Sequence, residues 1–187
     1  MTVELVYETH SLTTDNEAGF ATGWLPGRLS ERGRILAAAL GARRRDDGVD
    51  AVFASDLKRA VETAEIAFGG TAIPVHLDAR LRECDYGALN GQPVALIEAE
   101  RAKRITERYP GGESYVDVVA RTRLFLADLV RDYSGRRVVV IAHSANKRAL
   151  DHLLYGSPPA ELVLAPFEWR EGWRYVVPDD WAASAPG

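Results

Sequence analysis

Short apolar runs rich in β-branched residues recur along the chain and predict the strands of a sheet. The clearest is Val-Val-Val-Ile-Ala at residues 138–142, a continuous apolar run typical of a central parallel strand buried on both faces. Residues 3–7 and 51–54 are shorter runs of the same kind. Residues 73–77 form a fourth, and Pro74 places it at an edge of the sheet.

Segments with a helical spacing of apolar positions lie between these runs. Residues 113–131 are the clearest helix, because their apolar side chains fall on one stripe. Ser30 and Ser55 each stand where the N-cap of a helix is expected. The helix after Ser30 ends in the basic triplet 43–45, which suits the helix dipole and needs no functional explanation. Two further helices are predicted over residues 94–108 and 146–154.

The alternation of strand and helix predicts one domain over residues 1–178. Its expected fold class is α/β, a three-layer α/β/α sandwich with a mostly parallel central sheet and right-handed crossovers. Residues 162–177 predict two strands around the sequence Arg170-Glu171-Gly172, which would form a hairpin-like tail. Residues 179–187 are expected to be frayed.

The composition of the 187 residues is globular, with 47% apolar and 27% charged residues. A net charge of −4 argues against a general nucleic-acid binder, which needs a basic face. No apolar run approaches the ~20 residues of a membrane helix, and the pattern of a secretory signal is absent. The single cysteine, Cys84, excludes a disulfide framework. We therefore expect a cytoplasmic protein that binds neither nucleic acid nor membrane.

Arginine accounts for 20 of the 23 basic residues. The codon usage of a GC-rich genome explains such an excess, and we favour this interpretation. The alternative is that some arginines are placed for bidentate contacts with anions. Composition does not separate the two interpretations, so the positions of individual arginines have to decide.

Two of the four histidines follow predicted strands. His10 lies shortly after residues 3–7, and His143 directly follows residues 138–142. Ligands of open α/β sheets bind outside the carboxyl ends of the strands, so these two histidines are expected to meet at one site. The alternative is that each is a polar loop residue, but two matching positions favour function. His76 lies within a predicted strand and His152 on a helix, and both are interpreted as structural.

Six segments, in order between residue 3 and about residue 156, resemble motifs of the histidine phosphatase superfamily, in its phosphoglycerate mutase-like branch of small phosphatases. Any one of these matches is weak alone, but the ordered set is specific. The segments are Thr9-His10-Ser11 with Asn16, Leu29-Ser30-Glu31-Arg32-Gly33, Ser55-Asp56-Leu57-Lys58-Arg59-Ala60 with Thr63-Ala64, Leu81-Arg82-Glu83 with Asp85-Tyr86-Gly87, Pro110-Gly111-Gly112-Glu113-Ser114, and Val140-Ile141-Ala142-His143 with Arg148-Ala149-Leu150.

The resemblance implies a site for phosphoryl transfer. A neutral imidazole nitrogen of His10 would attack phosphorus. Arg59 and His143 would hold the phosphoryl oxygens, where negative charge is spread, and Asn16 would fix His10 or the phosphate. Glu83 is the candidate general acid for the leaving oxygen. The alternative for Glu83 is an ion pair with a neighbouring arginine, Arg80 or Arg82.

The chain departs from the family pattern beside each histidine. Thr9 replaces an arginine that would touch the phosphate, which costs on the order of 1.5–3 kcal/mol if no other cation takes its place. Ser11 and Ser144 replace glycines and add two hydroxyls near the phosphate. Either another cation, Arg28 or Lys147, moves in, or the substrate differs, or catalysis is impaired. The first two explanations are preferred because the other site residues are intact.

The leading prediction is a metal-independent phosphomonoester hydrolase without a cofactor, acting on a small phosphorylated metabolite. A phosphoglycerate-type mutase is the first alternative. Residues 84–112, where the family carries a cap over its site, are few, and so small a cap favours water as the acceptor.

The second alternative is an impaired anion-binding or regulatory domain, in which the tail tryptophans contact a partner. Packing of these tryptophans on the domain edge is the preferred interpretation. A dimer is possible. The tryptophans are Trp169, Trp173 and Trp181, and the substrate-side candidates are Arg28, Arg80, Arg82, Tyr86 and Lys147.

Overall fold

The computed structural model describes residues 1–181, and five of its strands form one sheet in the order β4-β3-β6-β1-β7. Neighbouring strands are parallel except for β7, which is antiparallel to β1. The edge strand β4 includes His76 and follows Pro74, as predicted. The five strands are β1 (Thr2–Thr9), β3 (Ala51–Ala54), β4 (Val75–Leu77), β6 (Arg137–Ala142) and β7 (Trp173–Pro178).

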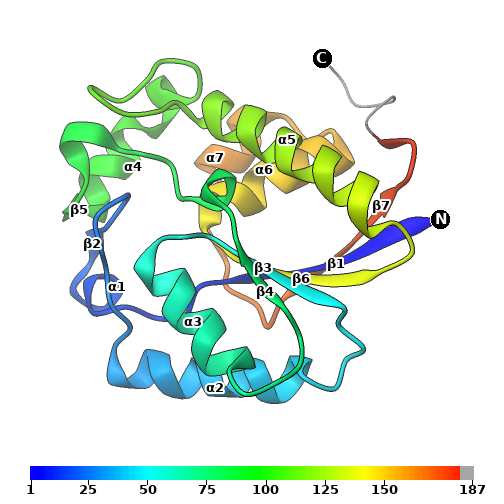
Figure 1. Cartoon of the computed structure of the whole chain (residues 1–187). Helices are drawn as coiled ribbons and strands as arrows, with labels where there is room; N and C mark the ends of the chain where they lie inside the picture. Colours follow the sequence, from blue (N-terminus) through cyan, green and yellow to red (C-terminus); the bar gives the residue numbers. More distant parts are fainter. Residues whose placement is uncertain (182–187) are drawn as a thin grey trace.

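Helices cover both faces of this sheet, which confirms the predicted three-layer fold (Figure 1). The central strand β6 shows why, because its apolar side chains alternate between two cores. Val138 and Val140 pack with α5, whereas Val139 and Ile141 pack with α3. One face carries α2 (Glu31–Arg44) and α3 (Lys58–Phe68). The other carries α5 (Tyr115–Tyr133), α6 (Ser144–Tyr155) and α7 (Pro159–Leu164).

Smaller elements gather at the end of the sheet where β1, β3 and β6 finish (Figure 1). Strands β2 and β5 pair with each other and bring the chain after His10 against the segment before α4. None of the helices in residues 1–181 is long and apolar enough to cross a membrane. These elements are α1 (Thr14–Ala18), β2 (Phe20–Ala21), the 3-10 helices η1 (Ala79–Leu81) and η2 (Gly87–Leu89), β5 (Gln92–Pro93) and α4 (Val94–Arg104).

The predicted hairpin-like tail is wrong. Residues 159–164 form α7 instead, with a proline at its first turn, a position that tolerates the missing N–H. Of the two strands predicted in this tail only the second forms, as β7. It pairs with β1 along its length, from Thr2 opposite Pro178 to Tyr7 opposite Trp173. The expectation of a frayed end is also wrong for Trp181, which is 5% exposed and donates from Nε1 to the Leu153 carbonyl at 3.2 Å. Residues 182–187 lie outside the described residues.

Two helix starts differ from their predicted places. Ser30 caps α2 as predicted, accepting from the backbone N–H of Gly33. Ser55 does not cap α3, because the N-cap is Leu57 and the Ser55 hydroxyl accepts from the Leu57 N–H instead. Helix α6 begins at Ser144, directly after His143, and so starts before residue 146.

Candidate active site

Strands β1 and β6 are parallel neighbours, so the residues that follow them share one edge of the sheet. The backbone N–H of His10 continues the ladder and donates to the Ala142 carbonyl at 2.8 Å. His143 is the next residue after β6 and the N-cap of α6. The two imidazole rings lie with centroids 5.0 Å apart, so the structure brings together the two histidines that the sequence placed at strand ends.

Arg59 lies between the two histidines. It follows β3 on the first turn of α3, and its side chain is only 2% exposed. Its Nε lies 3.3 Å from Nε2 of His10, and its Nη2 lies 3.3 Å from Nδ1 of His143. Nη2 also donates to the Gly23 carbonyl at 2.8 Å, which fixes the guanidinium in the cavity. One buried cation therefore faces both imidazoles.

These contacts determine which nitrogen of each neutral imidazole carries the proton. His10 Nδ1 lies 2.7 Å from the Ser11 carbonyl, which only accepts, so Nδ1 carries the proton and Nε2 has the lone pair. A guanidinium only donates, so His143 accepts through Nδ1 and carries its proton on Nε2. Within residues 1–181 that buried Nε2 has no hydrogen-bond partner. The lone pair of His10 thus lies at the cavity, whereas the unpaired N–H belongs to His143, which is fully buried beside His10 and does not line the cavity.

Both histidines are held neutral at physiological pH. Burial, followed by the charge of Arg59, lowers the pKa of His10 to about 3. The same two causes, in the same order, lower the pKa of His143 well below its usual value, and His10 adds to them. A neutral imidazole is the form that acts as a nucleophile, so burial prepares His10 for attack.

The depressed histidine pKa values predict acid destabilisation. Unfolded histidines bind protons below about pH 6.5, whereas His10 in the folded protein does so only near pH 3. The contribution of these histidines to the free energy of unfolding is therefore fully present above pH 6.5. It is lost as the pH falls from 6.5 toward 3, by about 1.4 kcal/mol per pH unit for each buried histidine. Urea unfolding at pH 7, 6 and 5 measures this slope, and His10→Asn should make it shallower. An identical slope in the variant contradicts the prediction.

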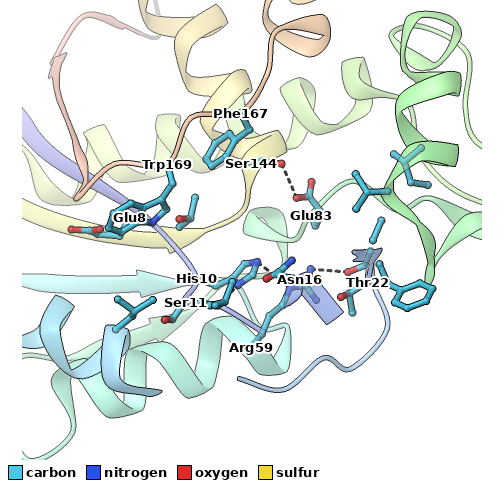
Figure 2. Close-up of a pocket in the computed structure, with 18 of the residues that line it drawn as sticks. Glu8, His10, Ser11, Asn16, Thr22, Arg59, Glu83, Ser144, Phe167 and Trp169 are labelled. Atoms are coloured by element: carbon cyan, nitrogen blue, oxygen red, sulfur yellow. Dashed lines mark hydrogen bonds between the residues drawn. The ribbon is translucent and has the colours of Figure 1, made fainter. Parts of the chain in front are cut away.

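Glu83 follows η1 and enters the same cavity. Its Oε1 accepts from the Cys84 N–H at 2.8 Å, and its Oε2 accepts from the Ser144 hydroxyl at 3.2 Å. The alternative of an ion pair with a neighbouring arginine is wrong. Arg80 binds the carboxylates of Asp78 and Asp128, and Arg82 binds that of Asp56 with two hydrogen bonds of 2.7 and 2.6 Å. The carboxyl of Glu83 is thus left facing the cavity (Figure 2).

The candidate phosphate-binding residues all line the cavity, but their polar groups are not equally available. The Ser11 hydroxyl donates to the Gly33 carbonyl at 2.6 Å, and the Ser144 hydroxyl donates to Glu83. Asn16 uses Oδ1 to accept from the Thr13 N–H, while its amide nitrogen makes no hydrogen bond within residues 1–181. Thr9, the last residue of β1, is buried at the cavity wall. Asn16 and Thr9 are therefore better placed to meet a ligand than the two serines.

Of the substrate-side candidates, only Tyr86 lines the cavity. Arg28 is exposed and lies outside the cavity lining, and Arg82 is held by Asp56 with its guanidinium 4.6 Å from the Trp24 ring. Lys147 forms an ion pair with Asp151, one turn later on α6. The expectation that Arg28 or Lys147 takes the place of the missing arginine is wrong, because neither reaches the cavity.

The cavity has a volume of about 530 Å³ and contains residues that the sequence analysis missed. Besides Arg59, three further arginines line it, one of them from the basic triplet that was explained by the helix dipole alone. Arg32 lies in a segment that resembles a family motif but was given no role, and no motif pointed to the other two, since their positions depend on how α2 and α4 pack. Trp169 was expected to pack on the domain edge but lines the cavity and is 55% exposed. The missed residues are Phe20, Arg32, Arg43, Arg101, Phe167 and Trp169.

Residues behind the cavity hold the reactive groups in place. The Thr63 hydroxyl accepts from the Ser11 N–H at 2.9 Å, which fixes the loop after His10 against α3. Gly33 allows α2 to approach that loop, because a Cβ there would lie 1.9 Å from the Leu12 carbonyl oxygen. The Glu83 carbonyl accepts from Trp24 Nε1 at 2.7 Å and from Arg121 Nη2 at 2.9 Å. Hydrogen bonds of this kind restrict the geometry of a site before a ligand arrives.

No group of three or more metal-ligating side chains in residues 1–181 is arranged to hold a metal ion. A family model described as "Histidine phosphatase superfamily (branch 1)" matches residues 9–168. A 2,3-bisphosphoglycerate-dependent phosphoglycerate mutase of Methylobacterium radiotolerans is 34% identical over 174 residues, covering 84% of this chain and 82% of the relative. A glucosyl-3-phosphoglycerate phosphatase of Mycobacterium tuberculosis is 35% identical over 175 residues, covering 83% and 77%.

Solved structures show the same likeness. A structure titled mycobacterial hydrolase 1 superimposes with a TM-score of 0.83 at 30% identity, covering 94% of this chain and 91% of the other. The structure of a mycobacterial glucosyl-3-phosphoglycerate phosphatase with VO3 gives a TM-score of 0.76 at 33% identity, covering 86% and 85%. These relatives resemble this chain along most of its length, and their names include both phosphatases and mutases.

Proposed function

Because the chain belongs to branch 1 of the histidine phosphatase superfamily, we propose that it is a hydrolase of phosphomonoesters that works through a phosphohistidine at Nε2 of His10. One observation carries this proposal. The lone pair of His10 Nε2 lies 3.3 Å from the Arg59 guanidinium, in a cavity that also contains the Glu83 carboxyl. A nucleophile, a cation for the phosphoryl oxygens and a proton donor are thus within one cavity.

In the first step, Nε2 of His10 forms a bond to phosphorus while the bond from phosphorus to the ester oxygen breaks. Arg59 turns its donors from the imidazoles to the non-bridging oxygens, since its 3.3 Å contacts with the histidines are long for hydrogen bonds. The unused Nε2–H of His143 donates to the same group. The leaving oxygen takes the proton of the Glu83 carboxyl and departs as an alcohol.

In the second step, water attacks the phosphorus of the phosphohistidine and gives a proton to the Glu83 carboxylate. The phosphorus–nitrogen bond breaks, and its electron pair returns to Nε2 of His10. Inorganic phosphate leaves, and the proton on Glu83 restores the starting state. The net reaction is hydrolysis of one ester bond, with a small phosphorylated metabolite as substrate and no metal ion in any step.

Turnover of 4-nitrophenyl phosphate in excess chelator tests this proposal. We expect hydrolysis to continue with chelator present and a phosphoenzyme to be trapped by an alkaline quench. The label should map to His10 and be labile in acid, as a phosphoramidate is. Label that survives acid and maps to Ser11 or Ser144 would contradict a histidine nucleophile. Absence of turnover across a broad panel of phosphomonoesters would contradict the hydrolase.

A mutase is the second candidate, because one relative of similar identity is named a phosphoglycerate mutase. Both reactions share the phosphohistidine and differ in whether water or a second hydroxyl accepts the phosphoryl group. We favour water because the segment over the site is small and contains α4 as its one α-helix. The test supplies a phosphoglycerate together with a bisphosphate primer. If the phosphoglycerate is isomerised faster than it is hydrolysed, the mutase is favoured over the hydrolase.

An impaired anion-binding domain is the remaining candidate, since Thr9 stands where the family has an arginine. Intact placement of His10, Arg59, Glu83 and His143 speaks against it. Binding of inorganic phosphate without turnover of any phosphomonoester in the panel would favour it over the hydrolase.

A further inference from the structure

Residues that line the cavity lie on both sides of His10 (Figure 2). On the side of α4 it is lined by Phe20, Tyr86, Val94, Ile97 and Arg101, which we call the cap arm. On the other side it is lined by Glu8, Thr9, Leu36, Leu40, Arg43 and Trp169, which we call the Thr9 arm. Figure 2 shows Glu8 and Trp169 on the opposite side of His10 from Thr22. The short side chain of Thr9 leaves this second arm open next to the nucleophile.

Arg43 provides unused hydrogen-bond donors in the Thr9 arm. Its side chain is 24% exposed, and its buried Nε has no hydrogen-bond partner within residues 1–181. Its nearest carboxylate oxygens, on Glu8 and Glu171, lie 3.6 and 3.7 Å away, beyond hydrogen-bond distance. The neighbouring Arg44 differs, because it donates at 2.8 Å to both Glu8 Oε1 and the Glu171 carbonyl. Arg44 is held by short hydrogen bonds, whereas Arg43 forms only these two longer ion pairs, so its guanidinium keeps donors that a ligand can use.

The charges around Arg43 select against a second anion. Glu8 is buried at the wall of the arm and the exposed Glu171 pairs with Arg43, so two carboxylates already balance the two arginines. An additional anion in the arm would be attracted by the guanidinium of Arg43 but repelled by the carboxylate of Glu8. A neutral oxygen, such as a hydroxyl, accepts from Arg43 without that repulsion.

Trp169 is an exposed aromatic side chain on a fixed segment. Arg148 donates to the carbonyls of Leu162 at 2.8 Å and Ala165 at 3.2 Å, and Arg44 holds the carbonyl of Glu171. Gly172, with φ of +88°, lets the chain pass the Arg44–Glu8 pair, where a Cβ would lie 2.4 Å from Arg44 Nη2. Both ends of the segment are thus anchored. An indole held in this way offers a flat surface at low entropic cost.

We propose that the alcohol part of the substrate lies in the Thr9 arm and is a neutral ring that carries hydroxyl groups, as in a sugar phosphate. The ring packs its flat face on Trp169, and its hydroxyls accept from Arg43. This inference rests on the proposed hydrolase function and names the class of substrate for that site. It also explains the loss of the family's arginine, because an arginine at position 9 would fill the entrance of the arm.

The experiment compares kcat/KM for a hexose 6-phosphate with kcat/KM for glycerol 1-phosphate, which has hydroxyls but no ring. We expect the ratio to favour the hexose phosphate in the unmodified protein. It should fall by about 3- to 10-fold in Arg43→Gln, the scale of one hydrogen bond, and similarly in Trp169→Leu. Thr9→Arg should lower it on the order of tenfold or more by filling the arm.

Arg101→Gln is the matched control. Arg101 lines the cap arm, has a buried Nε without a hydrogen-bond partner in the described part of the chain, and lies 3.6 Å from its nearest carboxylate, on Glu98. The ratio should be unchanged in this variant, and thermal melting verifies that each variant is folded. A ratio that falls in Arg101→Gln but not in Arg43→Gln would place the alcohol in the cap arm and overturn the inference.

Three other outcomes would also overturn the inference. A loss in Arg43→Gln that is confined to a phosphorylated carboxylic acid would show that the arm takes a second anion, which overturns the neutral ring. Turnover of 4-nitrophenyl phosphate with an unchanged ratio in all variants would overturn this inference alone. Absence of turnover of all these esters in the unmodified protein would overturn the proposed function as well.

Discussion

Replacement of His10 by alanine is expected to lower kcat for a phosphomonoester by about 10⁴-fold or more, the scale seen when a catalytic nucleophile is removed. Nε2 of His10 is the nitrogen with an available lone pair, because Nδ1 is bound to the Ser11 carbonyl. The Ser11 hydroxyl does not replace it, since that hydroxyl donates to the Gly33 carbonyl. Steady-state kinetics and the alkaline-quench assay for phosphoenzyme measure the loss.

His76→Ala is the control for this variant. His76 lies on the edge strand β4, is exposed, and packs against the Phe53 ring at a centroid distance of 5.3 Å, away from the cavity lining. Its removal should leave kcat within about twofold, as for most surface substitutions. Turnover in His10→Ala that stays within tenfold of the unmodified protein would exclude His10 as the nucleophile.

Replacement of Arg59 by glutamine is expected to lower kcat/KM by about 10²- to 10³-fold, as for the loss of a preorganised donor to developing charge. Arg59 has a second effect through His10. Burial is the larger cause of the low pKa of His10, and the charge of Arg59 is the next. Without that charge the pKa of His10 rises, so imidazolium forms at higher pH. The acidic limb of the pH profile of kcat/KM should therefore move to higher pH.

Lys58→Gln is the matched control for Arg59→Gln. Lys58 is the preceding residue on α3, is exposed, and does not line the cavity. The variant therefore removes one positive charge, as Arg59→Gln does, but outside the cavity. It should change neither kcat/KM nor the acidic limb appreciably. An Arg59→Gln profile whose acidic limb stays in place would show that Arg59 does not act on the imidazole, whatever its effect on rate.

The meeting of the two histidines was predictable because it depends on topology. Parallel strands that are neighbours end at the same edge of the sheet, and β6 is the neighbour of β1. The apolar run of β6 is buried on both faces because helices cover both sides of the sheet. Since His10 and His143 directly follow these two strands, they must lie close together. Arg59 was named only through the family resemblance, and the structure places it after β3, the other neighbour of β6.

The cations around the cavity were not predictable in this way. Lys147 was a candidate from its distance to His143 in sequence, but Asp151 lies one turn further on the same helix face and pairs with it. Arg43 looked like a helix-end charge, and only the packing of α2 beside β1 turns it toward the cavity. The α7 segment was misread because its apolar residues suit a strand as well as a short helix, and the tertiary contact with Arg148 decides between them.

The strand that leads into His10 pairs only with strands that lie far along the sequence. β1 begins at Thr2, but its two neighbours in the sheet, β6 and β7, are formed by residues 137–142 and 173–178. Contacts between residues so distant in sequence require closure of long loops, which slows folding. We therefore expect β1 to join the sheet late in folding, when these long-range contacts form, and the cavity beside His10 to be assembled at the same stage.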